Sequence, residues 1–373
     1  MPTKLNRAGN QQNYVPAGNG DARGEYGDNA TGSNKNFQAI KRENRLKLLN
    51  NKTSNNKIKE LISKVSDKLT PEGTEIIDYM LGKHADSLGE IVYDDNKSSL
   101  YDNYDKSISL SEEAFNRNWE NEGQALIHEL AHHFTTETKI EVDGKKYPIG
   151  LAPIFENRQS FSDVIKKEAQ SLNRTKNIDI IRQEKDNALN KELEKIGATR
   201  EEYDNLNNLI KQQPEYQIRL DKIRDDFRYG RITRKEAYKR LDNIYNEIQD
   251  AFPNTELAKK CERYQLLDKT ITNARNGWYK SSGIANVSDM LSSNTYKGGT
   301  SGFGIGHNPN YYKYIYNYYG ENKNDNYAQE FISNTLSAIA TGNNAEIEAT
   351  KKYLPKSYEA FTYLINKYYK GEK

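Results

Sequence analysis

The segment with the clearest potential for chemistry is residues 128–132, His-Glu-Leu-Ala-His, which stands between apolar neighbours. Four residues separate the two histidines, so a helix places both imidazoles on one face, where they can bind the same zinc ion. Glu129 then lies beside a water molecule on the metal and can take its proton as hydroxide attacks a carbonyl group. Residues 128–133 hold three of the chain's five histidines. The pattern predicts a metal site for hydrolysis, and its plain alternative is a helix with two incidental surface histidines.

A zinc ion that catalyses hydrolysis needs a third protein ligand and an open fourth position. In the metzincin pattern a glycine and a histidine follow the second motif histidine at fixed spacing, but those positions hold Thr135 and Thr138, which excludes that class. We expect Glu330 to be the third ligand, because its helix offers aromatic and aliphatic residues for packing while the carboxylate faces the metal. Glu156 is the second candidate, since a thermolysin-like arrangement takes its glutamate from the next helix, yet it follows a proline in a poorly helical stretch.

The motif at 128–132 and the later Gln-Glu330-Phe resemble the gluzincin-type domain of the anthrax lethal factor and Pro-Pro endopeptidase group. A related metallopeptidase-like domain, found at the ends of phage minor head proteins and of mobile-element or polymorphic-toxin proteins, resembles the chain more closely. That likeness lies in residues 287–291 (Val-Ser-Asp-Met-Leu), 302–307 (Gly-Phe-Gly-Ile-Gly-His), 329–331 (Gln-Glu-Phe) and 351–361. It covers about residues 70–155 and 280–370. The resemblance implies a zincin-like fold with Zn²⁺ held by His128, His132 and Glu330.

The residue that stabilises the oxyanion of the transition state stays open. The lethal-factor group carries a tyrosine seven residues before its glutamate ligand, whereas position 323 here is Lys. Tyr319 and Tyr327 are the neighbouring aromatic candidates, and His307 is the rival. The chain has 27 tyrosines, so ordinary packing explains either tyrosine equally well.

Three further polar residues are neighbours of the candidate ligands in the sequence or are histidines like them. Asn334, one helical turn after Glu330, can orient a ligand histidine through a hydrogen bond. We expect His133 to lie on the helix surface, and His84 has no evident partner in the sequence.

Composition excludes several classes of protein. Lysine and arginine number 55 and aspartate and glutamate 53, so the net charge of +2 excludes a purely electrostatic binder, and we expect no nucleic-acid partner. No window approaches the roughly 20 apolar residues of a membrane span, and the start lacks the apolar run of a secretory signal. We expect a cytoplasmic or virion-associated protein, with delivery by a non-classical route left open. Cys261 is the only cysteine, which excludes an intramolecular disulfide framework.

The fold class that the sequence predicts is α+β and mainly helical: a zincin-like domain with a small sheet and an inserted helical arm. Residues 1–36 are rich in glycine and asparagine and predict a disordered leader. We assign 37–159 to the first part of the zincin domain and 252–373 to the second. Between them, residues 160–251 are charged and nearly free of glycine, which favours a long helical hairpin or coiled arm.

Local signals define the elements around the motif. Thr70-Pro71 suits the start of a helix, and Asp143-Gly144 suits a type I′ turn. The expected elements are helices over 70–82, 327–340 and 345–369, the last interrupted near Pro355, short strands over 91–93 and 108–110, and a hairpin over 139–147.

These observations predict a zinc-dependent endopeptidase, a hydrolase that cleaves a protein or peptide substrate. A virion protein or an immunity protein is the expected kind of further partner. The alternative is a non-catalytic or self-processing structural protein, such as a minor virion component that retains a zincin fold. Glu129 favours catalysis, since a pure scaffold has no physical need for a general base.

Overall fold

The computed structural model describes residues 41–94, 99–112, 115, 120–153, 158–172, 174–292, 295–296, 299–300, 303, 306–307 and 326–366. The chain divides into two units, residues 1–42 and 43–373, and every labelled helix and strand belongs to the second unit. The predicted leader, and the candidates Glu156 and Tyr319, lie outside the described residues.

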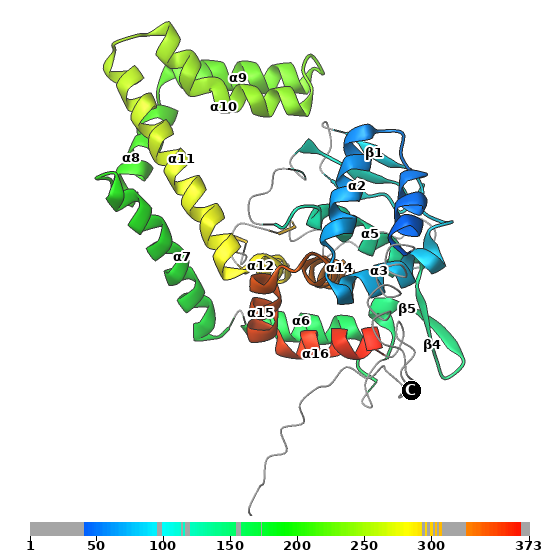
Figure 1. Ribbon diagram of the computed structural model, residues 1–373. Helices are drawn as coiled ribbons and strands as arrows, with labels where there is room; N and C mark the ends of the chain where they lie inside the picture. Colours follow the sequence, from blue (N-terminus) through cyan, green and yellow to red (C-terminus); the bar gives the residue numbers. More distant parts are fainter. Residues whose placement is uncertain are drawn as a thin grey trace, which may run out of the picture. The chain divides into compact units, whose positions relative to one another are not determined.

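The described part of the chain is mainly helical with small sheets, which confirms the predicted fold class at this level (Figure 1). Residues 41–50 are helical. The labelled elements are α2 (Asn56–Lys68), α3 (Pro71–His84), β1 (Ile91–Tyr93), β2 (Leu100–Tyr101), β3 (Ile108–Leu110), α5 (Gln124–Glu137), β4 (Lys139–Val142), β5 (Lys145–Pro148), η1 (Ile149–Leu151), α6 (Phe161–Leu172), α7 (Lys176–Lys195), α8 (Arg200–Lys211), α9 (Pro214–Arg228), α10 (Arg234–Ala251), α11 (Glu256–Ser282), α12 (Ala285–Ser292), β6 (Thr295–Tyr296), β7 (Gly299–Thr300), α14 (Asn326–Thr341), α15 (Asn344–Tyr353) and α16 (Pro355–Leu364). None of the helices in these described ranges combines the length and the apolar character that a membrane span needs.

The strands form one three-stranded sheet and two hairpins. In the sheet, of order β1-β3-β2, β1 runs parallel and β2 antiparallel to β3. The predicted hairpin is confirmed as β4 and β5, and Asp143 and Gly144 take the positive φ values of 52° and 75° that a type I′ turn requires. The pair β6 and β7 forms the other hairpin.

The sequence signals for helix starts are confirmed, whereas one of the predicted helix ends is wrong. The Thr70 hydroxyl accepts a hydrogen bond from the Gly73 amide and caps α3, with Pro71 as the first helical residue. The predicted end at Gly82 is wrong, because α3 continues to His84. A glycine with an ordinary helical φ weakens a helix without ending it when the rest of the helix is packed. The predicted break near Pro355 is confirmed, since α15 ends at Tyr353 and α16 begins at this proline.

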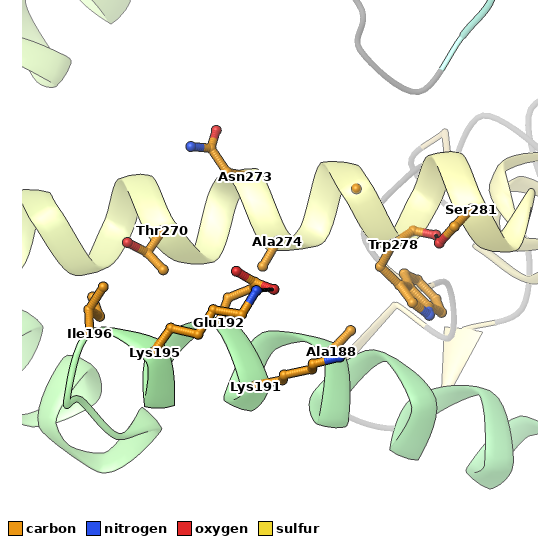
Figure 2. A pocket seen from close by; sticks show the side chains of 11 residues that line it. Ala188, Lys191, Glu192, Lys195, Ile196, Thr270, Asn273, Ala274, Trp278 and Ser281 are labelled. Carbon is orange, nitrogen blue, oxygen red and sulfur yellow. Dashed lines mark hydrogen bonds and ion pairs between the residues drawn. The ribbon is translucent and has the colours of Figure 1, made fainter.

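Helices α7 to α11 share two hydrophobic clusters of their own. One joins α8, α9, α10 and α11 and includes Ile210, Ile244 and Cys261, and the other joins α7 and α11 through Leu193 and Leu267. Figure 2 shows α7 and α11 side by side, with Ala188, Ala274 and Trp278 along their contact. Helix α6 instead packs in the main cluster with α16 and α14. How far residues 160–251 are independent of the rest stays a prediction.

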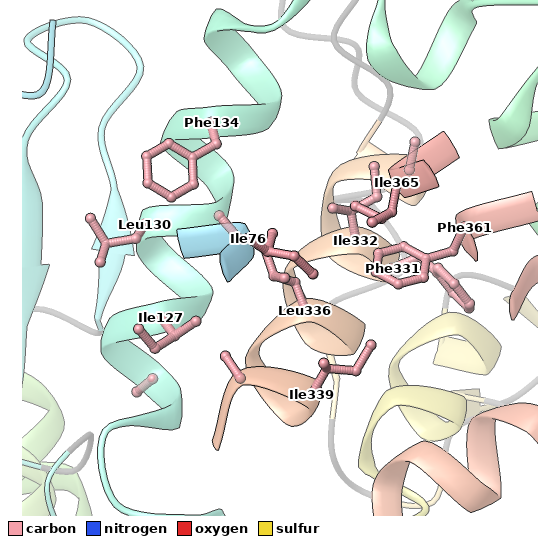
Figure 3. Packing of buried hydrophobic residues seen from close by; sticks show 14 of the residues in the cluster. Ile76, Ile127, Leu130, Phe134, Phe331, Ile332, Leu336, Ile339, Phe361 and Ile365 are labelled. Atoms are coloured by element: carbon pink, nitrogen blue, oxygen red, sulfur yellow. The ribbon is translucent and has the colours of Figure 1, made fainter. Parts of the chain in front are cut away.

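The main hydrophobic cluster lies around α14, which packs against α5 more extensively than any other described pair of elements does. Figure 3 shows Leu336 of α14 beside Ile76 of α3, while Leu130 points away from α14 on the other side of α5. Nearly every residue of α14 from Ala328 to Ala340 is buried. A helix buried all round belongs to the interior of a domain, so α5 and α14 are fixed against each other by packing.

The start of α5 has no room for a side chain. Gly123, the N-cap residue, has a φ of 82°, and a Cβ atom there would lie 1.8 Å from Val65 Cγ2. Glycine is required at this position both for the backbone conformation and for the contact with α2.

We therefore expect Gly123→Ala to lower the free energy of unfolding by roughly 2–4 kcal/mol, because strain and overpacking add. Gly144→Ala is the matched control: its φ is 75° but nothing lies within 4 Å of the added Cβ, so only the strain remains. Urea unfolding of both variants measures the difference. Equal losses in the two variants would show that the contact with Val65 has no energetic weight.

Candidate metal centre

Helix α5 brings the two motif histidines together. Four residues apart on one face, His128 and His132 have their Nε2 atoms 3.0 Å apart and their rings at 78° to each other. This face is turned toward α14, because Glu330 of that helix lies close to both rings. Two imidazole nitrogens at this distance either share a proton or point at a common ion.

Helix α14 supplies Glu330 from nearly 200 residues further along the chain. Its Oε2 lies 3.4 Å from His128 Nε2 and its Oε1 lies 3.4 Å from His132 Nε2, and the residue is only 1% exposed. With ligand bonds of about 2.0–2.1 Å, two atoms of a tetrahedral shell are about 3.3 Å apart. Each imidazole nitrogen therefore faces its own oxygen of the Glu330 carboxylate at a distance close to that between two ligand atoms of one metal ion.

Glu129 lies beside this group. A carboxylate oxygen of Glu129 and one ring nitrogen each of His128 and His132 all lie within 4.8 Å of one another, and Glu129 is buried. Its position next to His128 on the helix places a proton acceptor at the edge of the cluster.

A second group of side chains, Asp289 and His307, lies against the Glu330 carboxylate. The Asp289 Oδ1 atom accepts hydrogen bonds from the His307 main-chain amide at 2.8 Å and from His307 Nδ1 at 3.1 Å. A carboxylate only accepts, so Nδ1 carries the proton and Nε2 faces Glu330 Oε1 at 3.7 Å. Asn334 donates to Asp289 Oδ2 at 3.0 Å. Asn334 therefore acts on the partner of His307, and the expectation that it orients a ligand histidine is replaced by this contact.

The charges of this cluster balance only when positive charge surrounds Glu330. Burial by itself raises the pKa of Glu330, but the charges of His307 and His132 outweigh burial and hold this pKa well below its usual value. Burial lowers the pKa of His128 and His307, but the surrounding carboxylates together outweigh burial. Glu330 and Glu129 raise the pKa of His128 to about 9, and Glu330, Asp289 and Glu129 raise that of His307 to about 10. A metal cation supplies the same positive charge, and ligand histidines release their protons when it binds.

The remaining predicted residues lie elsewhere. Tyr327 packs against the main cluster, with the Lys166 ammonium 5.0 Å from its ring centroid. The expectation that His133 lies on the surface is wrong: it is fully buried, with its ring nitrogens 3.0 Å from Tyr101 Oη and 3.0 Å from the His84 carbonyl. Because α5 is covered by α14 on one face and by β2 and β3 on another, it has little surface to offer.

Asp289 has a role that the sequence patterns did not reveal. The signal was present, because Asp289 is the only charged residue of α12, just as Glu330 is the only charged residue of α14. A single carboxylate in a helix that is otherwise uncharged and buried needs a partner, and such groups gather at functional sites.

Glu346 is a buried carboxyl behind the start of α5. It is 3% exposed, and its Oε2 accepts hydrogen bonds from Gln124 Nε2 at 2.7 Å and from Asn343 Nδ2 at 3.1 Å. Burial raises the pKa of Glu346 to about 8, although the hydrogen bond from Gln124 lowers it. This network ties α15 to the first turn of the helix that carries the histidines.

No family model, curated protein or solved structure matches this chain. Any function assigned to the cluster therefore depends on the chemistry of its side chains.

We expect Glu330→Gln to weaken zinc binding by about a hundredfold or more, since it removes the only anionic donor of the three. Titration of purified protein with zinc against a competing chelator measures the affinity. Glu129→Gln, changed in the same way beside the cluster, should keep its affinity. Unchanged affinity in Glu330→Gln would remove Glu330 from the ligand set and return attention to Glu156.

The raised pKa of Glu346 predicts a pH-dependent stability. Its folded-state pKa of about 8 lies above the usual 4.5, so the neutral carboxyl is favoured by folding and stability is lost as pH rises from 4.5 through 8. Glu346→Gln should equal the wild type near pH 4.5 and exceed it above pH 8 by up to about 5 kcal/mol. Urea unfolding of chelator-treated protein at both pH values measures this. Glu348→Gln, on the same helix but 71% exposed, is the control, and parallel pH curves for wild type and Glu346→Gln would contradict the assignment.

Proposed function

We propose that this chain is a zinc-dependent endopeptidase with a zincin-like fold. The observation that carries the proposal is the convergence of His128 and His132 with the buried Glu330 carboxylate, each imidazole nitrogen 3.4 Å from one of its oxygens, with Glu129 beside them. A carboxylate from a distant helix would not need to meet two imidazoles in this way if they were incidental surface residues.

The donor set favours zinc over other common ions. Two imidazole nitrogens and one carboxylate oxygen suit Zn²⁺, whereas Mg²⁺ and Ca²⁺ prefer shells made of oxygen. Three protein ligands leave a fourth position for water or substrate, which is the arrangement of a catalytic site. When bound there, zinc polarises a carbonyl group and lowers the pKa of a water molecule toward about 7.

Residues of the chain perform the remaining steps. Glu129 accepts a proton from the attacking water and passes it to the leaving amine. His307 donates from Nδ1 to Asp289, and its raised pKa favours the imidazolium form, in which Nε2 also carries a proton. In that form it is the described candidate best placed to stabilise the oxyanion, while Tyr327 packs against the main cluster. Glu330 stays ionised and supplies the negatively charged ligand from α14.

The chemistry of the site suits hydrolysis at a carbonyl group, and the resemblance suggests that the substrate is a protein or peptide. Self-processing belongs to the same proposal. A virion component or an immunity protein is the kind of further partner that the resemblance suggests. A structural role without catalysis is the competing function, and the loss of the general base separates the two.

Glu129→Gln should keep zinc and lower hydrolysis by about 10²- to 10⁴-fold, the usual worth of a general base. The measurement is mass spectrometry of cleavage products after incubation with a peptide library, together with the termini of the chain itself to detect self-processing. Glu137→Gln, at the other end of α5 and paired with Lys106, is the matched control and should cleave as the wild type does. Equal cleavage by wild type and Glu129→Gln would refute the mechanism, and no cleavage by the zinc-loaded wild type would favour the structural role.

A further inference from the structure

Phe303 is held by side chains of three helices, and none of these side chains is a proposed zinc ligand. Its carbonyl oxygen accepts hydrogen bonds from Lys185 Nζ of α7 at 2.8 Å and from the Tyr279 hydroxyl of α11 at 2.6 Å. Its amide donates to Ser288 Oγ of α12 at 2.8 Å. The ring is 3% exposed and meets Trp278 edge to face, with centroids 6.2 Å apart. One residue is thereby fixed through its main chain and its side chain.

His307, four residues later in the chain, is seated on the same helix, α12. Its amide bonds to Asp289, the neighbour of Ser288, and its carbonyl accepts from Ser292 Oγ at 2.9 Å. Gly306 has a φ of 129°, and a Cβ atom there would lie 2.7 Å from Asp289 Cα. The main chain at positions 306 and 307 therefore lies directly on α12, only a few residues from Phe303.

The position of Lys185 is costly for a lysine. Burial and the nearby charge of Arg275 both lower the pKa of its ammonium, and a long lysine stem on a helix can otherwise reach water. A hydrogen bond between an ammonium and a carbonyl adds only a modest gain in stability. This gain does not by itself account for a half-buried ammonium. A fixed Phe303 carbonyl, by contrast, restrains the position of His307 four residues later in the chain.

We propose that Lys185 of α7 and Tyr279 of α11 are positioning residues for His307. They clamp the Phe303 carbonyl and so set where the His307 imidazole meets Glu330. The catalytic consequence rests on the proposed function, in which His307 stabilises the oxyanion. The geometric consequence is independent of it. Displacement of a reacting group by about 1 Å costs on the order of a hundredfold in rate, so a clamp outside the cluster affects turnover without touching substrate.

The geometric test uses metal-free full-length protein with isotope-labelled histidine. The chain has only five histidines, so His307→Ala assigns the His307 ring signals by their disappearance. In Lys185→Met and Tyr279→Phe we expect shifted or exchange-broadened His307 signals, with a larger change in the double variant. The signals of His84 and His133, which contact each other outside the metal cluster, should stay in place. Lys185→Arg keeps a donor and should restore the wild-type signal.

Two control variants make the same chemical changes away from the clamp. Lys191→Met changes an exposed lysine of α7, and Tyr238→Phe changes an exposed tyrosine of α10, so both should leave His307 unchanged. Unshifted His307 signals in the folded double variant would overturn the proposal. Equal shifts at His84, His133 and His307 would overturn it as well, because the substitutions would then perturb the domain as a whole.

Zinc affinity and turnover complete the test. Both clamp variants should bind zinc as the wild type does, and on a peptide that the wild type cleaves, kcat should fall about tenfold or more with KM preserved. A loss of zinc affinity like that expected for Glu330→Gln would show that the clamp positions the zinc ligands instead of His307, and would overturn the proposal. Shifted His307 signals in a protein that cleaves no peptide would uphold the clamp and refute the proposed function.

Discussion

The structure around the candidate metal centre depends on one buried carboxylate. Glu330 is 1% exposed in a helix with no other charge. Burying a lone carboxylate costs several kcal/mol unless opposite charge and hydrogen bonds surround it. The imidazoles of His128, His132 and His307 meet this requirement, and they can do so only while α5 and α12 stay in place against α14. The site and the core therefore depend on each other.

The C-terminal end of α14 is fixed by residues far away in sequence. The Thr70 hydroxyl and amide donate to the carbonyls of Ile339 and Ala340, and Asn121 Nδ2 donates to the Thr341 carbonyl. Gly73 lies so close that a Cβ atom there would be 2.3 Å from Ala340 Cα. These bonds satisfy the last carbonyls of a buried helix, which otherwise lack partners. The register of α14, and with it the position of Glu330, is set at this end.

Helix α12 lies at the centre of the hydrogen bonds that join Phe303 and His307 to the rest of the structure. Ser288 binds Phe303, Asp289 and Ser292 bind His307, and the Phe303 carbonyl in turn meets side chains of α7 and α11. Helices α7 and α11 belong to smaller clusters of their own and also to the main cluster, to which they contribute Ile178, Ile181, Trp278 and Tyr279. Helices α7 and α11 thus contribute hydrogen bonds to a residue four positions from a candidate catalytic histidine. This arrangement gives α7 and α11 a physical connection to the candidate site that their charged sequences do not suggest.

The sequence alone determined the features that depend on neighbours along the chain. Spacing of four placed His128 and His132 on one face, Thr70 marked a helix start, and the turn at Asp143 closed a hairpin. These are local consequences of helical periodicity and backbone preference. Only the tertiary structure decided which distant groups meet. Glu330 is expected at the histidines and lies there, but the bond from Asp289 to His307 and the burial of His133 have no local signal strong enough to predict them. Burial turns an ordinary carboxylate or imidazole into one that must find a partner, and which partner is in reach depends on how helices pack rather than on their order in the chain.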